Sequence, residues 1–247
     1  MSIGSHEELE AMRRVGRVVR LAREAMEHEV RPGITTGELD LVGARVLEEH
    51  GARSAPNLVY GFPRTTCISV NDEAVHGIPG DRVVREGDLV KLDVTAELDG
   101  YMADSAVTVP VPPVSDVARR LTACARVAFE QAMKVARVGK RVNDIGREVE
   151  GEVRRRGFAV IRDLAGHGIG RGIHEEPSVP NYYDWRARAP LTEGLVITVE
   201  PIVAQRSGAY VEDEDGWTVR TADRGWVAHH EHTLVITRGR PILLTAA

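Results

Sequence analysis

The chain has 247 residues, a formal net charge of −5 and two cysteines. This length suits one large domain or two small ones, and the acidic balance argues against nucleic acid as the main ligand. Two cysteines cannot build a disulfide framework, which favours a reducing compartment. No window approaches the roughly 18 apolar residues of a membrane span, and residues 1–14 lack the apolar stretch of a signal peptide. We therefore expect a soluble cytoplasmic protein with no membrane contact.

Two helices are predicted at the start of the chain. Ser5 is a typical N-cap, and Glu8 lies at the spacing of a capping box. An apolar stripe at helical spacing follows. The stripe consists of Leu9, Met12, Val15, Val19, Ala22 and Met26. Arg31-Pro-Gly33 ends this helix, and the next helix begins near Thr35.

Strands follow this helix pair. Residues 52–66 are predicted to form a loop, and residues 67–70 a short strand. Residues 88–109 are predicted to form a hairpin, because Asp99-Gly100 is a preferred pair for a two-residue turn. A second helix pair then follows the break at Pro112-Pro113. The last strands are expected near residues 196–204, 209–212, 217–221 and 229–237.

The chain contains an internal repeat. Two stretches begin with Glu-Gly, continue as an apolar strand and end seven positions later on an acid; they run from Glu86 to Asp93 and from Glu193 to Glu200. Three markers recur in one order at intervals of 106 or 107 residues. They are these two stretches, Arg31-Pro-Gly33 with Arg137-Val-Gly139, and His50-Gly51 with Arg156-Gly157. No linker divides the chain, so we expect one α+β domain, residues 1–247, with pseudo-equivalent halves of roughly residues 10–110 and 115–240.

The repeated strands each end in a carboxylate that a buried strand does not need. In a two-residue hairpin Thr95 pairs with Asp104, so Asp93 and Asp104 share one face as diagonal neighbours about 7–8 Å apart. Two carboxylates at that distance repel each other unless a cation lies between them. Exposed acids on a solvated face are the alternative, but the flanking apolar residues favour a sheet buried on both faces.

Glu200 and Glu231 form a second acidic pair. Glu231 lies in the strand His229-His-Glu-His-Thr. Strand alternation places His229 on the face of Glu231 and turns His230 and His232 to the other face. His230 and His232 are therefore expected to have supporting or structural roles.

His167 lies in Gly166-His-Gly-Ile-Gly, where glycines let the backbone approach a ligand closely. This segment is not a dinucleotide fingerprint, because Arg171 replaces the required third glycine. Asp93, Asp104, His167, Glu200 and Glu231 are then an oxygen-rich set with one imidazole. Such a set favours Mn(II), Fe(II), Co(II) or Mg-like ions. Two ions about 3.5–4 Å apart activate a hydroxide nucleophile and polarise a carbonyl, which is hydrolytic chemistry.

The order of these residues resembles the pita-bread metallopeptidases, and Asn71-Asp-Glu-Ala-Val-His76-Gly-Ile-Pro79 resembles type I methionine aminopeptidases in particular. The resemblance covers nearly the whole chain and implies a pita-bread fold and two divalent ions, drawn from cobalt, manganese, iron, zinc or nickel. It implies that Asp93 chelates one ion, that Asp104 and Glu231 bridge both, and that His167 and Glu200 hold the other.

The resemblance also implies catalytic and substrate-binding roles. Glu200 would act as general base, His76 would bond the scissile amide, and His174 would contact the substrate carbonyl oxygen. The methionine pocket would be lined by Tyr60, Phe62, Cys67 and Trp217. Ile173 stands before His174 where many relatives have Phe. The implied activity is removal of the initiator methionine from nascent chains with a small second residue, by a monomer with transient ribosome contact.

Three alternatives remain open from the sequence. A prolidase or Xaa-Pro aminopeptidase would share the five ligands but resembles the chain less around His76. A metal-free binding protein on the same fold is the second alternative, although all five ligand residues are present. A structural Mg-binding scaffold is the third; it predicts that Asp93→Asn lowers thermal stability with no activity to lose.

Overall fold

The computed structural model describes residues 1–246. It contains two long helix pairs and one short helix. The helices are α1 His6–Glu29, α2 Thr36–Glu49, α3 Ala55–Tyr60, α4 Asp116–Met133 and α5 Val142–Arg155. None of them combines the length and the apolar character that a membrane crossing requires.

The strands form four antiparallel sheets. They are β1 Arg53–Ser54, β2 Cys67–Val70, β3 Glu73–Val75, β4 Leu89–Leu98, β5 Tyr101–Pro110, β6 Ala159–Val160, β7 Ala165–Gly168, β8 Glu175–Pro180, β9 Val196–Val199, β10 Ile202–Ala204, β11 Tyr210–Glu212, β12 Val219–Thr221, β13 Val227–His229, β14 His232–Val235 and β15 Ile242–Leu243. One sheet joins β1 and β2 to one edge of β4 and β5 to the other, and another has the order β15-β14-β9-β7-β8.

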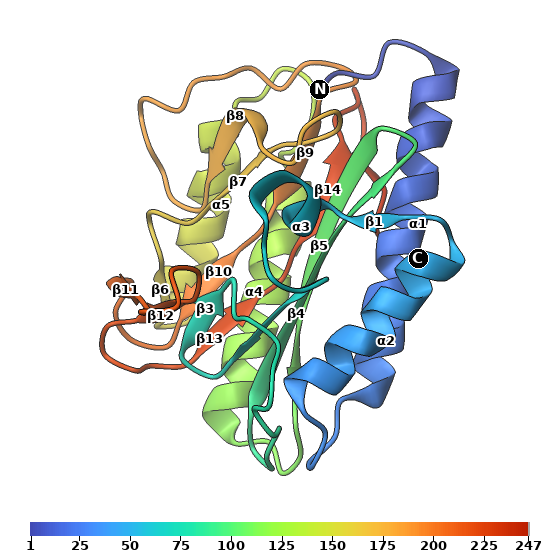
Figure 1. The fold of residues 1–247 in the computed structure, drawn as a ribbon. Helices are drawn as coiled ribbons and strands as arrows, with labels where there is room; N and C mark the ends of the chain where they lie inside the picture. Colours follow the sequence, from blue (N-terminus) through green and yellow to red (C-terminus); the bar gives the residue numbers. More distant parts are fainter. Residues whose placement is uncertain (247) are drawn as a thin grey trace.

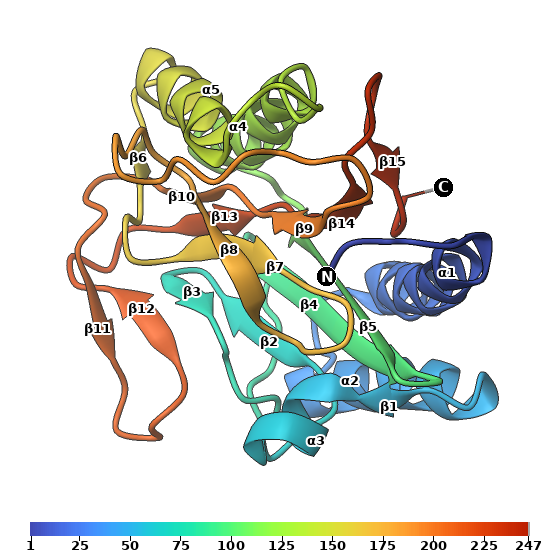
Figure 2. The same cartoon turned by 90° about the horizontal axis from the view of Figure 1, so that it is seen from above.

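The helix pairs cover the outer faces of the sheets. Figures 1 and 2 show α1 against the β4–β5 hairpin with α2 beside it, and α4 against β10 and β13 with α5 beside it, where α5 also contacts β6 and β8. Each pair closes its own core: the predicted stripe of α1 packs on β4 and β5, whereas apolar residues of α4 and α5 pack on the later strands. β3 and the β11–β12 hairpin form a separate small sheet on the side of the molecule opposite α1 (Figure 2).

The elements recur at the interval found in the sequence. Helix α5 begins and ends 106 residues after α2, and in both helices the third residue, Glu38 or Asp144, accepts from the backbone amide of the N-cap residue. Gly33 and Gly139, which precede these helices, have φ values of 92° and 89°. Ser54 pairs with Ala96 as Val160 pairs with Val203. The repeat is therefore visible in helix ends, turns and strand pairing alike.

The structure corrects three local predictions. Residues 52–66 are not wholly a loop, because Ser54 caps the short helix α3 and Pro56 stands in its first turn. The capping box predicted at Ser5 is only half formed: Ser5 accepts from the Glu8 amide, but the Glu8 carboxylate bonds the amide of Gly4. The strand expected at residues 196–204 is broken after Val199 into β9 and β10.

Two glycines of α5 give a matched stability test. A Cβ at Gly146 would lie 2.1 Å from the carbonyl oxygen of Tyr182, whereas one at Gly151 meets nothing within 4 Å. Gly146→Ala is expected to lower the free energy of unfolding by about 1–3 kcal/mol through overpacking. Gly151→Ala is expected to raise it by about 0.5–1 kcal/mol, since alanine favours a helix interior. Thermal melting of both variants checks this, and equal melting temperatures would contradict the packing of α5 on residues 180–182.

Candidate metal centre

The hairpin of the first half brings two carboxylates together as predicted. Thr95 pairs with Asp104 across β4 and β5, and Asp93 pairs with Ala106, so both acids lie on one face. The backbone of Asp104 is fixed from the other half, because its amide donates to Thr233 Oγ1 at 2.8 Å and its carbonyl accepts from the same hydroxyl. The two acids therefore lie where the two halves meet.

The second half has a counterpart of this hairpin, here called the second hairpin, in which β9 pairs with β14 and β10 with β13. Glu200 and Glu231 lie where its strands are interrupted. Both pairings follow one continuous register, and that register places Glu200 opposite Glu231. The amide of Glu231 donates to the carbonyl of Ala106 at 2.8 Å. This bond sets the second acidic pair against the first.

His167 on β7 completes the predicted set. Its amide donates to Thr198 Oγ1 at 3.0 Å, and that hydroxyl donates to Glu200 Oε1 at 2.9 Å. Its ring Nδ1 lies 2.8 Å from the carbonyl oxygen of Gly168, while Nε2 lies 3.8 Å from Glu200 Oε1. A carbonyl on one ring nitrogen is the usual arrangement that presents the other nitrogen to a metal.

The carboxylates are electrostatically unsatisfied without a cation. Burial raises the pKa of Asp104 to about 6, and burial together with the neighbouring acids raises the pKa values of Asp93, Glu200 and Glu231 well above their usual range. Among residues 1–246, buried Oδ1 atoms of Asp93 and Asp104 and Oε1 of Glu231 have no hydrogen-bond partner. Buried charges require pairing or a metal, so this donor set fits divalent cations.

The ligand atoms fall into two overlapping groups. Asp104, His167 and Glu231 each offer an atom within 4.8 Å of the others, and so do Glu200, His229 and Glu231. Glu231 belongs to both groups, which suits a ligand shared by two ions. The strand alternation predicted for the histidines is confirmed: His229 faces the acids, whereas His230 and His232 meet the ring of Phe129 edge to face. Burial lowers the pKa of His229 to about 3, which keeps its ring neutral.

Two exposed imidazoles stand beside the acids. His76 follows β3 with a φ of 58°, a conformation that only a few per cent of non-glycine residues adopt. The ring centroid of His174 lies 4.3 Å from that of His167. Tyr60 Oη lies 2.6 Å from His174 Nδ1, so the tyrosine predicted for the methionine pocket also orients this histidine.

Tyr60→Phe tests this contact. Loss of the hydroxyl leaves His174 free to turn, and kcat is expected to fall about 2–10-fold, the value of one hydrogen bond. Because the ring itself is kept, KM for a peptide substrate is expected to change much less. Steady-state kinetics separates the two constants. The exposed Tyr183 gives a control, and an unchanged kcat in Tyr60→Phe would contradict the positioning role.

Two of the remaining predicted pocket residues, Phe62 and Trp217, are in contact. The rings of Phe62 and Trp217 meet edge to face, with centroids 5.1 Å apart. Phe62 is fully buried, and Cys67 is buried opposite Asp93 in the β2–β4 pairing. Ile173 is a buried core residue next to His174.

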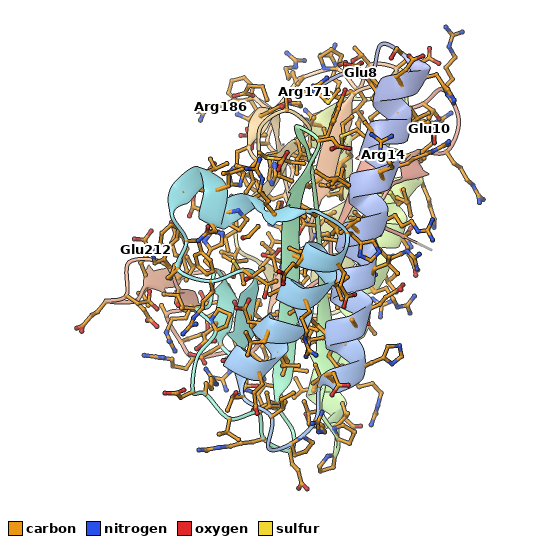
Figure 3. All side chains as sticks on the ribbon, turned by 45° about the vertical axis from the view of Figure 1, so that its right-hand side comes forward. Glu8, Glu10, Arg14, Arg171, Arg186 and Glu212 are labelled. Atoms are coloured by element: carbon orange, nitrogen blue, oxygen red, sulfur yellow. The ribbon has the colours of Figure 1, made fainter. Side chains whose placement is uncertain are left out.

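The loop that carries His174 is held by a cationic side chain. The Arg171 guanidinium stacks 3.6 Å from the ring centroid of Tyr101 and bonds its hydroxyl. The same guanidinium lies 3.6 Å from Glu8 Oε1 on α1; Figure 3 labels both residues at the same end of the molecule. Helix α1 therefore helps to place a loop of the second half.

Sequence reasoning gave no role to two residues at the centre. Thr198 links His167 to Glu200, and its position two residues before Glu200 on one strand face was a usable signal. His229 was placed on the face of Glu231, but no ligand role was assigned to it. The alternation of side chains along a strand gives the face on which His229 lies, but not the distance of its ring from Glu200 and Glu231.

Comparison with known proteins agrees with this geometry. Residues 10–238 match the model of metallopeptidase family M24, and the chain belongs to this family. It is 45% identical over 247 residues to methionine aminopeptidase 2 of Bacillus subtilis, with 99% of each chain covered. It is 42% identical over 248 residues to a methionine aminopeptidase of Staphylococcus epidermidis, covering 99% of this chain and 98% of the relative.

Solved structures confirm the pita-bread fold. The crystal structure of methionine aminopeptidase from Thermotoga maritima matches with a TM-score of 0.96 and 34% identity, and the match covers 100% of both chains. The prolidase from Pyrococcus furiosus matches with a TM-score of 0.81, at 22% identity and over 65% of its own length. That second match shows a shared fold alone.

Proposed function

We propose that the protein is a metal-dependent aminopeptidase that removes the N-terminal methionine from nascent proteins with a small second residue. The observation that carries this proposal is the cluster of buried Asp104, Glu200 and Glu231 with half-buried Asp93 and His167, beside the exposed rings of His76 and His174. The methionine aminopeptidases that cover the whole chain support the same activity. A Xaa-Pro peptidase is less well supported, because its relatives share only the fold.

The proposed centre takes two divalent ions. Asp93 would hold one ion, His167 and Glu200 the other, and Asp104 and Glu231 would bridge them. The orphaned oxygens of Asp93, Asp104 and Glu231 favour this assignment. When bound, the ions would supply an activated water and polarise the peptide carbonyl.

The chain's own residues would position the substrate and move protons. Glu200 would act as general base, because its carboxylate lies between His167 and Glu231 at the proposed centre and a carboxylate placed there can accept a proton from the attacking water. His76 would bond the scissile amide, and His174, oriented by Tyr60, would contact the carbonyl oxygen. The edge-to-face pair of Phe62 and Trp217 would receive the methionine thioether, which packs well against aromatic rings.

The proposed setting of this activity is the cytoplasm, where nascent chains emerge. We propose nascent N-termini as the substrate, transient contact with the ribosome, and a monomeric enzyme. The run Arg154-Arg155-Arg156 does not itself favour ribosome contact, because these side chains pair with Glu150 and Glu152 of their own helix.

Two peptides decide between the readings. The protein, supplied with Mn²⁺ or Co²⁺, is incubated with Met-Ala-Ser and separately with a Xaa-Pro peptide, and the products are separated chromatographically. We expect free methionine from the first peptide and no cleavage of the second. Cleavage of the Xaa-Pro peptide alone would overturn the proposal in favour of a prolidase-like enzyme.

A further inference from the structure

The internal repeat assigns a counterpart to one of the proposed ligands. In the first hairpin Thr95 pairs with Asp104, and in the second Ile202 pairs with His229. Thr95 and Ile202 are 107 residues apart, the interval that separates the two Glu-Gly strands. His229 therefore occupies, in the second half, the place that Asp104 occupies in the first.

Hydrogen bonds across the two halves repeat this equivalence. Thr233 Oγ1 accepts from the Asp104 amide and donates to the Asp104 carbonyl, both at 2.8 Å. Thr108 Oγ1 accepts from the His229 amide at 2.7 Å and donates to the His229 carbonyl at 2.8 Å. Thr108 and Thr233 are 125 residues apart, as are Asp104 and His229. The backbone is thus clamped in the same way at both positions.

The ring of His229 points into the acidic cluster. The residue is 2% exposed, and Nε2 lies 3.4 Å from Glu231 Oε2 and 4.0 Å from Glu200 Oε2. Over residues 1–246 this nitrogen has no hydrogen-bond partner. A buried nitrogen without a partner is costly, and these separations exceed the 2.7–3.2 Å of a normal hydrogen bond. They do suit donors about 2.0–2.2 Å from one shared ion.

We propose that His229 is a further nitrogen ligand of the metal centre, sharing an ion with Glu200 and Glu231. The inference rests on the metal centre of the proposed function and extends its donor set from one imidazole to two. Four carboxylates already balance the charge of two divalent ions. A neutral imidazole adds a donor without disturbing that balance. His229 would then join His167 on the ion that Glu200 holds, while Asp93 holds the other ion.

Cadmium-113 binding to protein labelled with nitrogen-15 in its histidine rings tests this directly. One-bond coupling between cadmium and nitrogen appears only where the ring is a ligand. Metal-free full-length protein is titrated with two equivalents of cadmium, and His229→Gln and His167→Gln assign the signals. We expect coupling to two rings, with one signal lost in each variant. Calorimetric titration with Mn²⁺ is expected to show at least about tenfold weaker binding of one ion to His229→Gln.

The outcomes separate this inference from the proposed function. Coupling to His167 alone would overturn the ligand role of His229 and leave the aminopeptidase proposal intact. No cadmium binding would overturn both. Coupling to both rings without hydrolysis of Met-Ala-Ser would support the inference and count against the function. The number of coupled rings is read from the wild-type protein, so it does not depend on any variant folding. His229→Asn assigns the His229 signal a second time. His230→Gln is the control for general effects of replacing a histidine, because the ring of His230 faces Phe129.

Discussion

Glu200→Gln is expected to lower kcat for Met-Ala-Ser by about 10²–10⁴-fold, the contribution of a general base. The amide cannot accept the proton, and it also replaces a charged metal ligand with a neutral one. Thr198 Oγ1 can still donate to the amide oxygen, as it does to Glu200 Oε1 at 2.9 Å, so the fold is expected to persist. Steady-state kinetics at saturating Mn²⁺ measures the loss, and elemental analysis reports the metal retained.

Glu193→Gln is the matched control for this substitution. Glu193 opens the repeated stretch that ends at Glu200, but it is exposed and pairs with Arg238 on the surface. Its loss is expected to leave kcat unchanged, since exposed ion pairs contribute little. Glu200→Gln with more than about a tenth of the wild-type kcat would contradict the role of Glu200 as base.

Asp93→Asn is expected to stabilise the metal-free protein at pH 8. Burial, followed by the charge of Asp104, raises the pKa of Asp93 in the folded protein. A carboxyl with a raised folded pKa is protonated more readily folded than unfolded, so it costs stability as pH rises above its unfolded value near 4. Each tenfold difference in proton affinity between the folded and unfolded carboxyl is worth about 1.4 kcal/mol, and a gain of about 2–4 °C in Tm accompanies each kcal/mol.

The pH and metal dependence of this gain are equally specific. The difference in Tm between variant and wild type is expected to shrink as pH falls toward the unfolded pKa of aspartate near 4, because the cost of the wild-type carboxyl disappears there. With Mn²⁺ at about 100 times its Kd the wild type should gain roughly 2.7 kcal/mol, and the variant much less. Differential scanning calorimetry with and without metal measures both effects. A metal-free variant that melts below the wild type at pH 8 would contradict the repulsive carboxylate cluster and favour a scaffold in which Asp93 makes stabilising contacts.

The predictable part of the site rests on strand geometry. Asp99-Gly100 sets a two-residue turn, and the pairing of Thr95 with Asp104 follows from it. Alternation likewise separates His229 from His230 and His232. These features are local, because a turn type and a period of two suffice to derive them. The repeat interval carries the same kind of information and predicts the second helix pair.

Other features depend on contacts between distant segments. The strand broken at Glu200 could not be predicted, because that break depends on how the second hairpin meets the first. The short helix α3 is not predicted from the sequence, because serine is common both in loops and at helix N-caps, and Ser54 is the N-cap here. The contact between Tyr60 and His174 joins residues 114 apart, and no local pattern encodes it.

Activity measured against bound metal tests the central claim most directly. The protein is freed of metal with a chelator and dialysed, and methionine release from Met-Ala-Ser is followed while Mn²⁺ is added in known equivalents. We predict no release by the metal-free protein and a return of activity that follows Mn²⁺ binding. Undiminished release by protein that elemental analysis shows to be metal-free would contradict the assignment of the buried carboxylates to a catalytic metal centre.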